Sequence, residues 1–90
     1  MNQIIRRASA GTLESSDVYV QIAPGDQGIQ IHLDSVVQAQ FGEEILAVVR
    51  EVLDDCQISN ANLSIQDRGA LDCVIRARVE TAVLRGKGEE

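Results

Sequence analysis

Residues 18–33 read Val-Tyr-Val-Gln-Ile-Ala-Pro-Gly-Asp-Gln-Gly-Ile-Gln-Ile-His-Leu. Apolar and polar side chains alternate in residues 18–22 and again in residues 29–33, which is the period of a half-buried β-strand. Pro24 and Gly25 between them favour a reversal of the chain. This pattern predicts an antiparallel hairpin with a loop longer than two residues, and therefore a sheet with one buried face.

A helix is predicted directly after these strands. Ser35 and Gln38 fit the Ser-x-x-Gln capping box, with Asp34 as a rival cap, and the helical spacing continues to about Cys56. One face of this helix is apolar and is expected to pack on the sheet. It holds Val37, Phe41, Ile45, Val48, Val49, Val52 and Cys56.

The rest of the chain completes a mixed fold. Residues 63–66 alternate as a short strand, and Asp67 is expected to cap a second helix over about residues 68–85. Residues 4–12 favour an edge strand. The expected class is α+β, a single domain over residues 1–90. It has a small, mostly antiparallel sheet with two helices packed on one face, in the order β-β-α-β-α with or without an extra N-terminal strand. The second helix packs through Leu71, Val74, Ile75, Val79 and Ala82.

Composition narrows the function classes. Hydrophobic residues make up 44% of the chain but aromatic residues only 2%, so the core is expected to be aliphatic. The net charge of −6 argues against nucleic acid or an anionic membrane as a partner. No apolar run approaches the roughly 20 residues that span a bilayer, so we expect a cytoplasmic protein. Cys56 and Cys73 match no zinc or redox spacing, and each is expected to be a small buried apolar side chain.

A polar turn precedes the first strand: Ala-Gly-Thr-Leu-Glu-Ser-Ser-Asp, residues 10–17. Ser15 and Ser16 can be ordinary turn residues, or one of them can present a hydroxyl for modification. His32, the one histidine, falls on the polar face of its strand, so no Ser-His-Asp or metal-binding set can be assembled. We therefore expect no catalytic residue and no metal site.

The serine turn resembles a known family. Ala-Gly-Thr-Leu-Glu-Ser (10–15), Ile-Ala-Pro (22–24), Gln-Phe-Gly (40–42) and Gly-Ala-Leu-Asp-Cys (69–73), followed by Arg-Ala-Arg (76–78), are similar in order and spacing to the acyl carrier protein (gamma subunit) family of citrate lyase. The resemblance implies that Ser15 carries 2′-(5″-phosphoribosyl)-3′-dephospho-CoA through a phosphodiester. The sequence leaves the adjacent Ser16 open as the attachment point.

The resemblance also implies partners and a role. A dedicated transferase attaches the arm, whose thiol holds acetyl and citryl thioesters. The alpha subunit (transferase) exchanges acetyl for citrate and releases acetate, and the beta subunit (lyase) releases oxaloacetate. The carrier itself is non-catalytic. The alternatives are the acyl carrier subunit of malonate decarboxylase, which uses the same type of arm, and an acidic interaction module whose Ser15 stays bare.

Three further features have two interpretations each. Asp-Ser-Val (34–36) resembles the Asp-Ser-Leu site of four-helix acyl carrier proteins, but Ser35 is better explained as a helix cap. Arg78 falls on the apolar face of the second helix, and its charge is expected to pass over the rim to water. The alternative is a pair with a carboxylate or with a phosphate of the arm. The acidic side of the first helix is either a solvated face or a docking surface, and it comprises Glu43, Glu44, Glu51, Asp54 and Asp55.

The turn should also differ from the helices in dynamics. We expect residues 10–17 to be exposed and more mobile than the two helices, because the segment is small and polar and precedes the first strand of the predicted hairpin.

Overall fold

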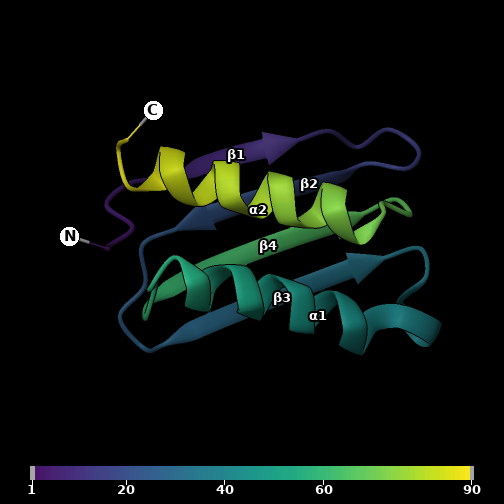
Figure 1. Cartoon of the computed structure of the whole chain (residues 1–90), viewed down its shortest axis with the longest axis horizontal. Coiled ribbons are helices and arrows are strands. Elements are labelled where there is room, and N and C mark those ends of the chain that lie inside the picture. The colour runs from purple at the N-terminus through teal and green to yellow at the C-terminus, as the bar shows by residue number, and fades with distance from the viewer. Residues whose placement is uncertain (1, 90) are drawn as a thin grey trace.

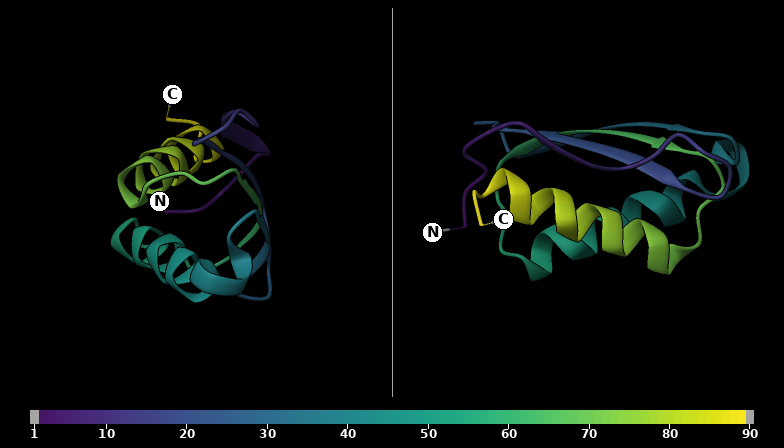
Figure 2. Two further views of the ribbon diagram at one scale, coloured as in Figure 1. Left: turned by 90° about the vertical axis from the view of Figure 1, so that its right-hand side faces the viewer. Right: turned by 90° about the horizontal axis from the view of Figure 1, so that it is seen from above.

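A computed structural model, which describes residues 2–89, shows a four-stranded sheet covered on one face by two helices (Figures 1 and 2). The elements are β1 (Ala8–Gly11), β2 (Val18–Ala23), β3 (Ile29–Ser35), α1 (Gln38–Asp55), β4 (Ala61–Asp67) and α2 (Asp72–Gly86). The α+β class, the two helices on one face and the extra N-terminal strand are confirmed.

The order of the strands differs from the predicted hairpin. The sheet runs β1-β2-β4-β3, so β4 lies between β2 and β3 and the two do not pair. β4 is antiparallel to β2 and parallel to β3, and β1 is antiparallel to β2. The hairpin prediction is therefore wrong, although both of its strands exist. A helical crossover joins β3 to β4, which a parallel pair requires.

The connection between β2 and β3 shows how β4 comes to lie between these two strands. Residues 24–28 pass over the start of β4 and are held there. Gly28 N–H donates to Asn60 Oδ1 at 2.8 Å, and Ala61 N–H donates to the Gly28 carbonyl at 3.1 Å. Gly25 lies against this strand, since a Cβ on it would stand 3.2 Å from the Ala61 carbonyl carbon. Residues 24–28 thus pass across β4 instead of closing a hairpin between β2 and β3.

The core lies between the sheet and the helices and is aliphatic, as predicted. Its largest fully buried apolar side chains are Ile22, Leu53, Ile65, Ile75, Val18, Val20, Val49, Val79 and Val83. The opposite face of the sheet is covered by neither helix (Figure 2). Polar side chains alternate onto it, with Gln21, His32 and Asn62 among those exposed. The predicted polar position of His32 is confirmed.

The first helix begins later than its predicted cap. α1 starts at Gln38, and its N-cap is Val37 without a side-chain cap. Ser35 ends β3 instead: its backbone N–H donates to Gln38 Oε1 at 3.3 Å, while its hydroxyl accepts from Val37 N–H at 3.1 Å. Only the Gln38 half of the capping box forms. Asp34 belongs to β3 and is exposed.

Besides Leu71 of the second helix, which is 71% exposed, Phe41 is an error in the predicted core. Its side chain is 45% exposed, whereas Ile45, Val48 and Val52 are buried as predicted. Phe41 lies in the first turn of α1, where the helix extends past the end of the sheet (Figure 1). Helical spacing places the residue on the correct face, but no strand lies beneath it.

The second helix also begins later than predicted. Asp67 ends β4, fully buried, and accepts hydrogen bonds from the Ser35 hydroxyl at 2.8 Å and from Ala70 N–H at 3.0 Å. It therefore ties the β4 end to the β3 end and the following turn, and caps no helix. α2 starts at Asp72, with the 71%-exposed Leu71 as N-cap. Gly86 is its last residue.

The connections β1–β2, β3–α1 and β4–α2 all lie at one end of the molecule, opposite the ends of the chain (Figure 1). Asn2 and Lys87 are hydrogen-bonded at that far end, with 3.1 Å between Asn2 Oδ1 and Lys87 Nζ. Within residues 2–89, no helix has the length and apolar character needed to cross a bilayer.

The difference in burial between β4 and the start of α1 can be tested by paired substitutions. Ile65 is fully buried in the middle of the sheet, so Ile65→Ala should lower the free energy of unfolding by about 2–5 kcal/mol. Phe41→Ala should lower it by no more than about 1 kcal/mol, as for other exposed sites. Urea unfolding measures both. Equal losses from the two substitutions would contradict the positions described here.

Candidate functional site

The serine turn is the loop that joins β1 to β2. Residues 12–16 are exposed, and the Asp17 N–H donates to the Glu14 carbonyl at 3.1 Å, which closes a four-residue turn. Ser15 and Ser16 are the two central residues of this turn. Ser15 takes the first corner, and within residues 2–89 no side chain or backbone group hydrogen-bonds its hydroxyl. The hydroxyl is therefore open to an incoming reactant.

Ser16 is held in a different way from its neighbour. Its φ of 65° lies in the left-handed region, the conformation that a type II turn needs at this position. Its N–H donates to the Arg68 carbonyl at 2.8 Å, and Arg68 N–H donates back to the Asp17 carbonyl at 2.9 Å. These two bonds fasten the second half of the turn to the β4–α2 connection. The backbone of Ser16 is constrained, whereas Ser15 stands at the free corner.

Gly11 sets the entry to the loop. Its φ is +95°, and a Cβ on it would stand 1.8 Å from the Val18 carbonyl oxygen and 3.3 Å from Arg78 Cδ. Only a residue without a side chain fits both the conformation and the space. The glycine of the Gly-Thr-Leu-Glu-Ser stretch is thus required by the close approach of β1, β2 and α2.

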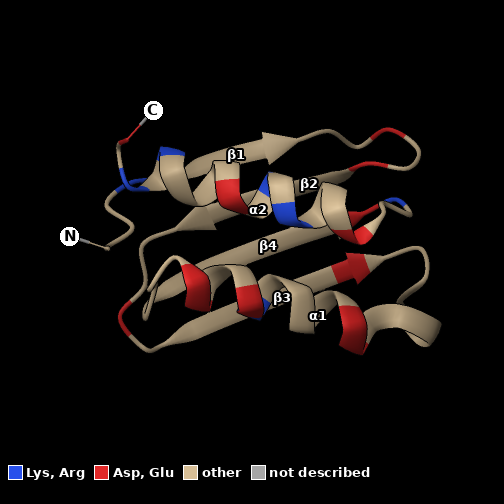
Figure 3. Cartoon of the chain, in the orientation of Figure 1, with Lys and Arg blue, Asp and Glu red and all other residues tan. Residues whose placement is uncertain are grey.

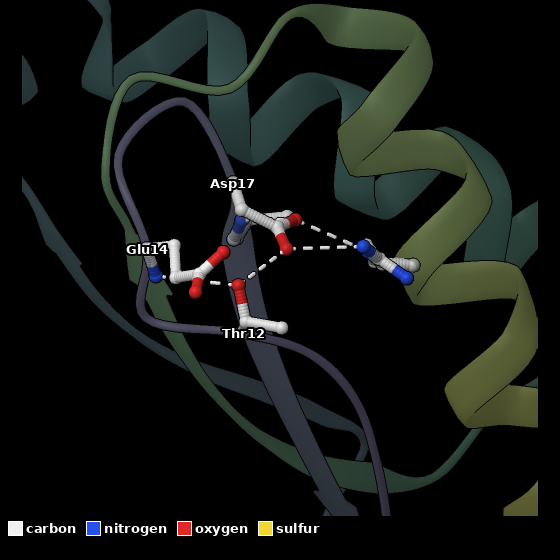
Figure 4. Close-up of polar contacts among 5 residues, drawn as sticks. Thr12, Glu14 and Asp17 are labelled. Atoms are coloured by element: carbon white, nitrogen blue, oxygen red, sulfur yellow. Dashed lines mark hydrogen bonds and ion pairs between the residues drawn. The ribbon is translucent and has the colours of Figure 1, made fainter.

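A carboxylate and a guanidinium fix the base of the loop (Figure 4). Arg78 Nε donates to Asp17 Oδ1 at 3.1 Å, and Arg78 Nη2 donates to Asp17 Oδ2 at 3.0 Å. The same carboxylate accepts from the Thr12 hydroxyl at 2.6 Å and from Val18 N–H at 2.7 Å. One residue therefore joins both strands of the loop to α2. These contacts, those from Thr12 and Arg78 foremost, lower the pKa of Asp17 from 3.8 to about 2.

This arrangement decides between the two interpretations of Arg78. The side chain pairs with a carboxylate, which was the alternative, and it remains 41% exposed at the rim. Sequence reasoning treated Asp17 only as a turn residue and missed its role. The available signal was an arginine on an apolar helix face together with a carboxylate directly before a strand.

The expectation for residues 10–17 holds only in part. Residues 12–16 are exposed, but Ala10 is 4% exposed within β1, because the segment begins inside the sheet and not before it. Asp17 is half-buried at the base of the loop. The greater mobility of the loop stays a prediction.

The other candidates lie apart from the serine loop. Ser35 is half-buried and bonded to Asp67, so its hydroxyl is already engaged. Cys73 is exposed and Cys56 half-buried, so the expectation of buried cysteines is wrong for Cys73. Burial raises the pKa of the Cys56 thiol. Within the described residues, no group of three or more His, Cys, Asp or Glu could hold a metal ion.

The base of the loop should respond to pH. The lowered pKa of Asp17 means that the ionised carboxylate stabilises the fold above about pH 4, and this contribution is lost as the pH falls toward 2. Asp17→Asn should cost on the order of 1 kcal/mol at neutral pH, since Arg78 is partly solvated. The difference in melting temperature between parent and variant should shrink below pH 4. Asp26→Asn in the exposed 24–28 connection is the control, and an Asp17→Asn difference that is constant from pH 7 to pH 2 would contradict this account.

Hydrogen exchange should separate the corner of the loop from its base. The N–H groups of Ser16 and Asp17 are bonded, whereas among the described residues no acceptor bonds those of Leu13 and Ser15. Leu13 and Ser15 should exchange fast, and Ser16 and Asp17 more slowly. Exchange at Leu13 and Ser15 as slow as in the helix cores would contradict a free corner.

Several known proteins are similar to this chain. The family profile described as "ACP: Malonate decarboxylase delta subunit (MdcD)" matches residues 5–86. The chain is 55% identical over 84 residues to the citrate lyase acyl carrier protein of Vibrio cholerae serotype O1 (strain M66-2), covering 92% of this chain and 86% of that protein. It is 56% identical over 79 residues to the citrate lyase acyl carrier protein of Klebsiella pneumoniae, covering 87% and 81%.

One solved structure has the same fold. A chain in the crystal structure of a Pseudomonas malonate decarboxylase hetero-tetramer in complex with malonate superposes with a TM-score of 0.81 at 23% identity, covering 94% of this chain and 88% of that chain. At this identity the likeness concerns the fold alone. The identities above 50% over most of the chain show that this chain belongs to the citrate lyase acyl carrier protein family.

Proposed function

We propose that this protein is the acyl carrier subunit of a citrate lyase complex and that Ser15 carries its prosthetic group, 2′-(5″-phosphoribosyl)-3′-dephospho-CoA. The observation that carries the proposal is the open hydroxyl of Ser15 at the corner of a loop with an anchored base. When attached, the arm supplies a thiol that carries acetyl and citryl groups during citrate cleavage to acetate and oxaloacetate. The chain itself supplies no catalytic residue.

The residues present fit such a group. A phosphodiester at a serine needs an accessible oxygen and space around it, and a modifying transferase provides the activation. Ser15 has both, because no described residue engages its hydroxyl and the turn projects from the end of the sheet (Figure 1). Ser16 is also exposed, but its left-handed backbone is fixed to Arg68, which supports Ser15 as the site.

The anchored base gives the carrier its mechanical role. Asp17, Thr12 and Arg78 fix where the loop leaves the sheet, so an attached group starts from a defined point. Tethering then replaces diffusion of a free thioester by a local search with a high effective concentration. The proposed partners are the alpha and beta subunits of the complex and the transferase that attaches the arm.

Two alternatives remain distinct from this proposal. A malonate decarboxylase carrier has in its favour the description of the matching family profile, but the relatives above 50% identity are named for citrate lyase. An interaction module with a bare Ser15 would keep the mass of the unmodified chain in its native host, which separates it from either carrier.

The attachment site can be tested by intact mass and peptide mapping of protein made in the presence of its transferase. The parent should gain the mass of the arm on the peptide that contains Ser15, and Ser15→Ala should fold normally and gain none. Ser16→Gly is the matched control. It should still accept the arm and keep its stability within about 1 kcal/mol, because glycine adopts a positive φ readily.

The outcomes are distinct. Added mass on Ser15→Ala, or its loss in Ser16→Gly, would move the site to Ser16. A modification mapped to Ser35 would move the attachment site to the Asp-Ser-Val stretch, residues 34–36. If the parent protein purified from its native host has only the mass of the unmodified chain, the carrier function itself is contradicted. With the arm in place, turnover of citrate and not of malonate by the assembled complex separates citrate lyase from malonate decarboxylase.

A further inference from the structure

Apolar side chains are exposed mainly around the serine loop. Among residues 2–89, the exposed large hydrophobic residues are Ile5, Leu13, Val36, Phe41 and Leu71. Four of these five lie in or next to the β1–β2, β3–α1 and β4–α2 connections, which all lie at the end of the molecule that carries Ser15 (Figure 1). Ile5 lies at the far end, beside Gly88. We call Leu13, Val36, Phe41 and Leu71 the serine-end patch.

The serine-end patch includes a hollow. A groove of about 500 Å³ runs between the first turn of α1 and the β4–α2 connection, with Phe41 on one side and Leu71 on the other. Val36 adjoins the same connection, since a Cβ on Gly69 would stand 4.0 Å from Val36 Cγ2. The next residue back, Arg68, is bonded to the serine turn through Ser16. Groove and serine turn are therefore fixed to one segment, residues 68–71.

Acidic residues surround this apolar surface. Glu44 and Asp72 line the groove, Glu14 lies in the β1–β2 connection, Asp34 lies near the end of β3, and Glu43 lies in the second turn of α1 (Figure 3). Arg78 is already engaged by Asp17. Glu51, which the sequence placed with a possible docking face along α1, is instead bonded to Arg76 at 2.7 Å. Asp54 and Asp55 lie at the other end of α1, whereas the five carboxylates near the serine end outnumber Arg68, the basic residue of the β4–α2 connection.

This inference rests on the proposed function. We propose that the serine-end patch is the docking surface for the catalytic subunit that receives the arm. That subunit would present an apolar socket with a basic rim. An apolar cluster exposed around the one group that must reach a partner is typical of an interaction site. Carboxylates around it favour a basic partner and speed the encounter. Each visit of the loaded serine would then be guided by contacts made by the carrier domain.

The same carboxylates make the arm itself an unfavourable occupant of the groove. The arm carries several phosphates, and the acidic rim repels them, so the arm is not expected to fold back into the groove. Leu71 and Val36, at 71% and 62% exposed, also project outward instead of lining a closed slot. Such side chains suit insertion into a partner better than enclosure of a ligand.

The test uses a double variant that should leave folding intact. Leu71 is the N-cap of α2 without a side-chain cap, so Leu71→Ser introduces a residue that this position favours. Phe41→Gln places a good helix former at an exposed helix position. Ile5→Ser is the matched control, because it removes an exposed apolar side chain, 66% exposed, at the opposite end. Binding of each purified chain, without the arm, to the purified alpha and beta subunits is measured by analytical ultracentrifugation or calorimetry.

The double variant should bind at least one catalytic subunit about tenfold or more weakly, whereas Ile5→Ser should stay within about twofold of the parent. Parent binding should also weaken as salt is raised, through the acidic rim. Unchanged binding by the double variant to both subunits would overturn the docking proposal, while the mass of the arm on Ser15 would leave the proposed function standing.

A second measurement tests whether the arm, and not a partner subunit, occupies the groove. The side-chain NMR signals of Phe41 and Leu71 are compared in the isolated carrier with and without the arm. Unchanged signals support an exposed docking surface, and large shifts on attachment would assign the groove to the arm and overturn the proposal. A parent that takes no arm and binds neither subunit would overturn the proposed function and the docking surface together.

Discussion

Strand β4 pairs with β2 on one side and with β3 on the other, and the layout of the sheet and of the crossover helix depends on this position. Because β4 runs parallel to β3, the chain must cross over from one to the other, and α1 makes that crossing on the buried face. Because β4 runs antiparallel to β2, the exit from β4 meets the entry to β2 at one end of the sheet. The Ser16–Arg68 contact exists only because of this meeting. The insertion of one strand thus brings the serine loop, the helix starts and the groove together.

The serine loop combines a fixed base with an open corner. Its base is held by charged and neutral hydrogen bonds converging on Asp17, while the corner at Ser15 has no such bonds. Ordering a backbone residue costs about 1–2 kcal/mol, so a loop that is fixed at its base has less to lose when it enters a partner. A corner without bonds still lets the serine approach more than one active site. The two properties are compatible because they lie on different residues of one short loop.

Much of the fold could be predicted from the sequence, because periodicity reports which face of an element is buried. The faces of β2 and β3, the buried side of α1 and the aliphatic core all followed from spacing. Strand neighbours did not, since alternation in residues 29–33 is the same whether the strand pairs with β2 or with β4. The exposure of Phe41 followed from where the sheet ends, which no helical pattern contains.

The candidate site shows the same division. The open position of Ser15 could be predicted from local sequence, whereas the bond between Asp17 and Arg78 joins residues 61 positions apart. Such a contact depends on the packing of α2 against β1 and β2. Asp67 was likewise misassigned as a helix cap because its partner, Ser35, is distant in sequence. Local chemistry predicts what a residue can do, and the fold decides which partner it meets.

The two ends of the chain lie beside each other, at the pole of the molecule opposite the serine loop (Figure 1). The β2–β3 connection, residues 24–28, is at that pole as well, because β2 ends and β3 begins there. A linker could therefore join residue 89 to residue 2, and new ends could be opened in 24–28, without touching the serine end. The positions of the chain ends can thus be changed in this carrier without altering the serine end. A fusion partner or a solid support attached at either end would leave the serine pointing away from it.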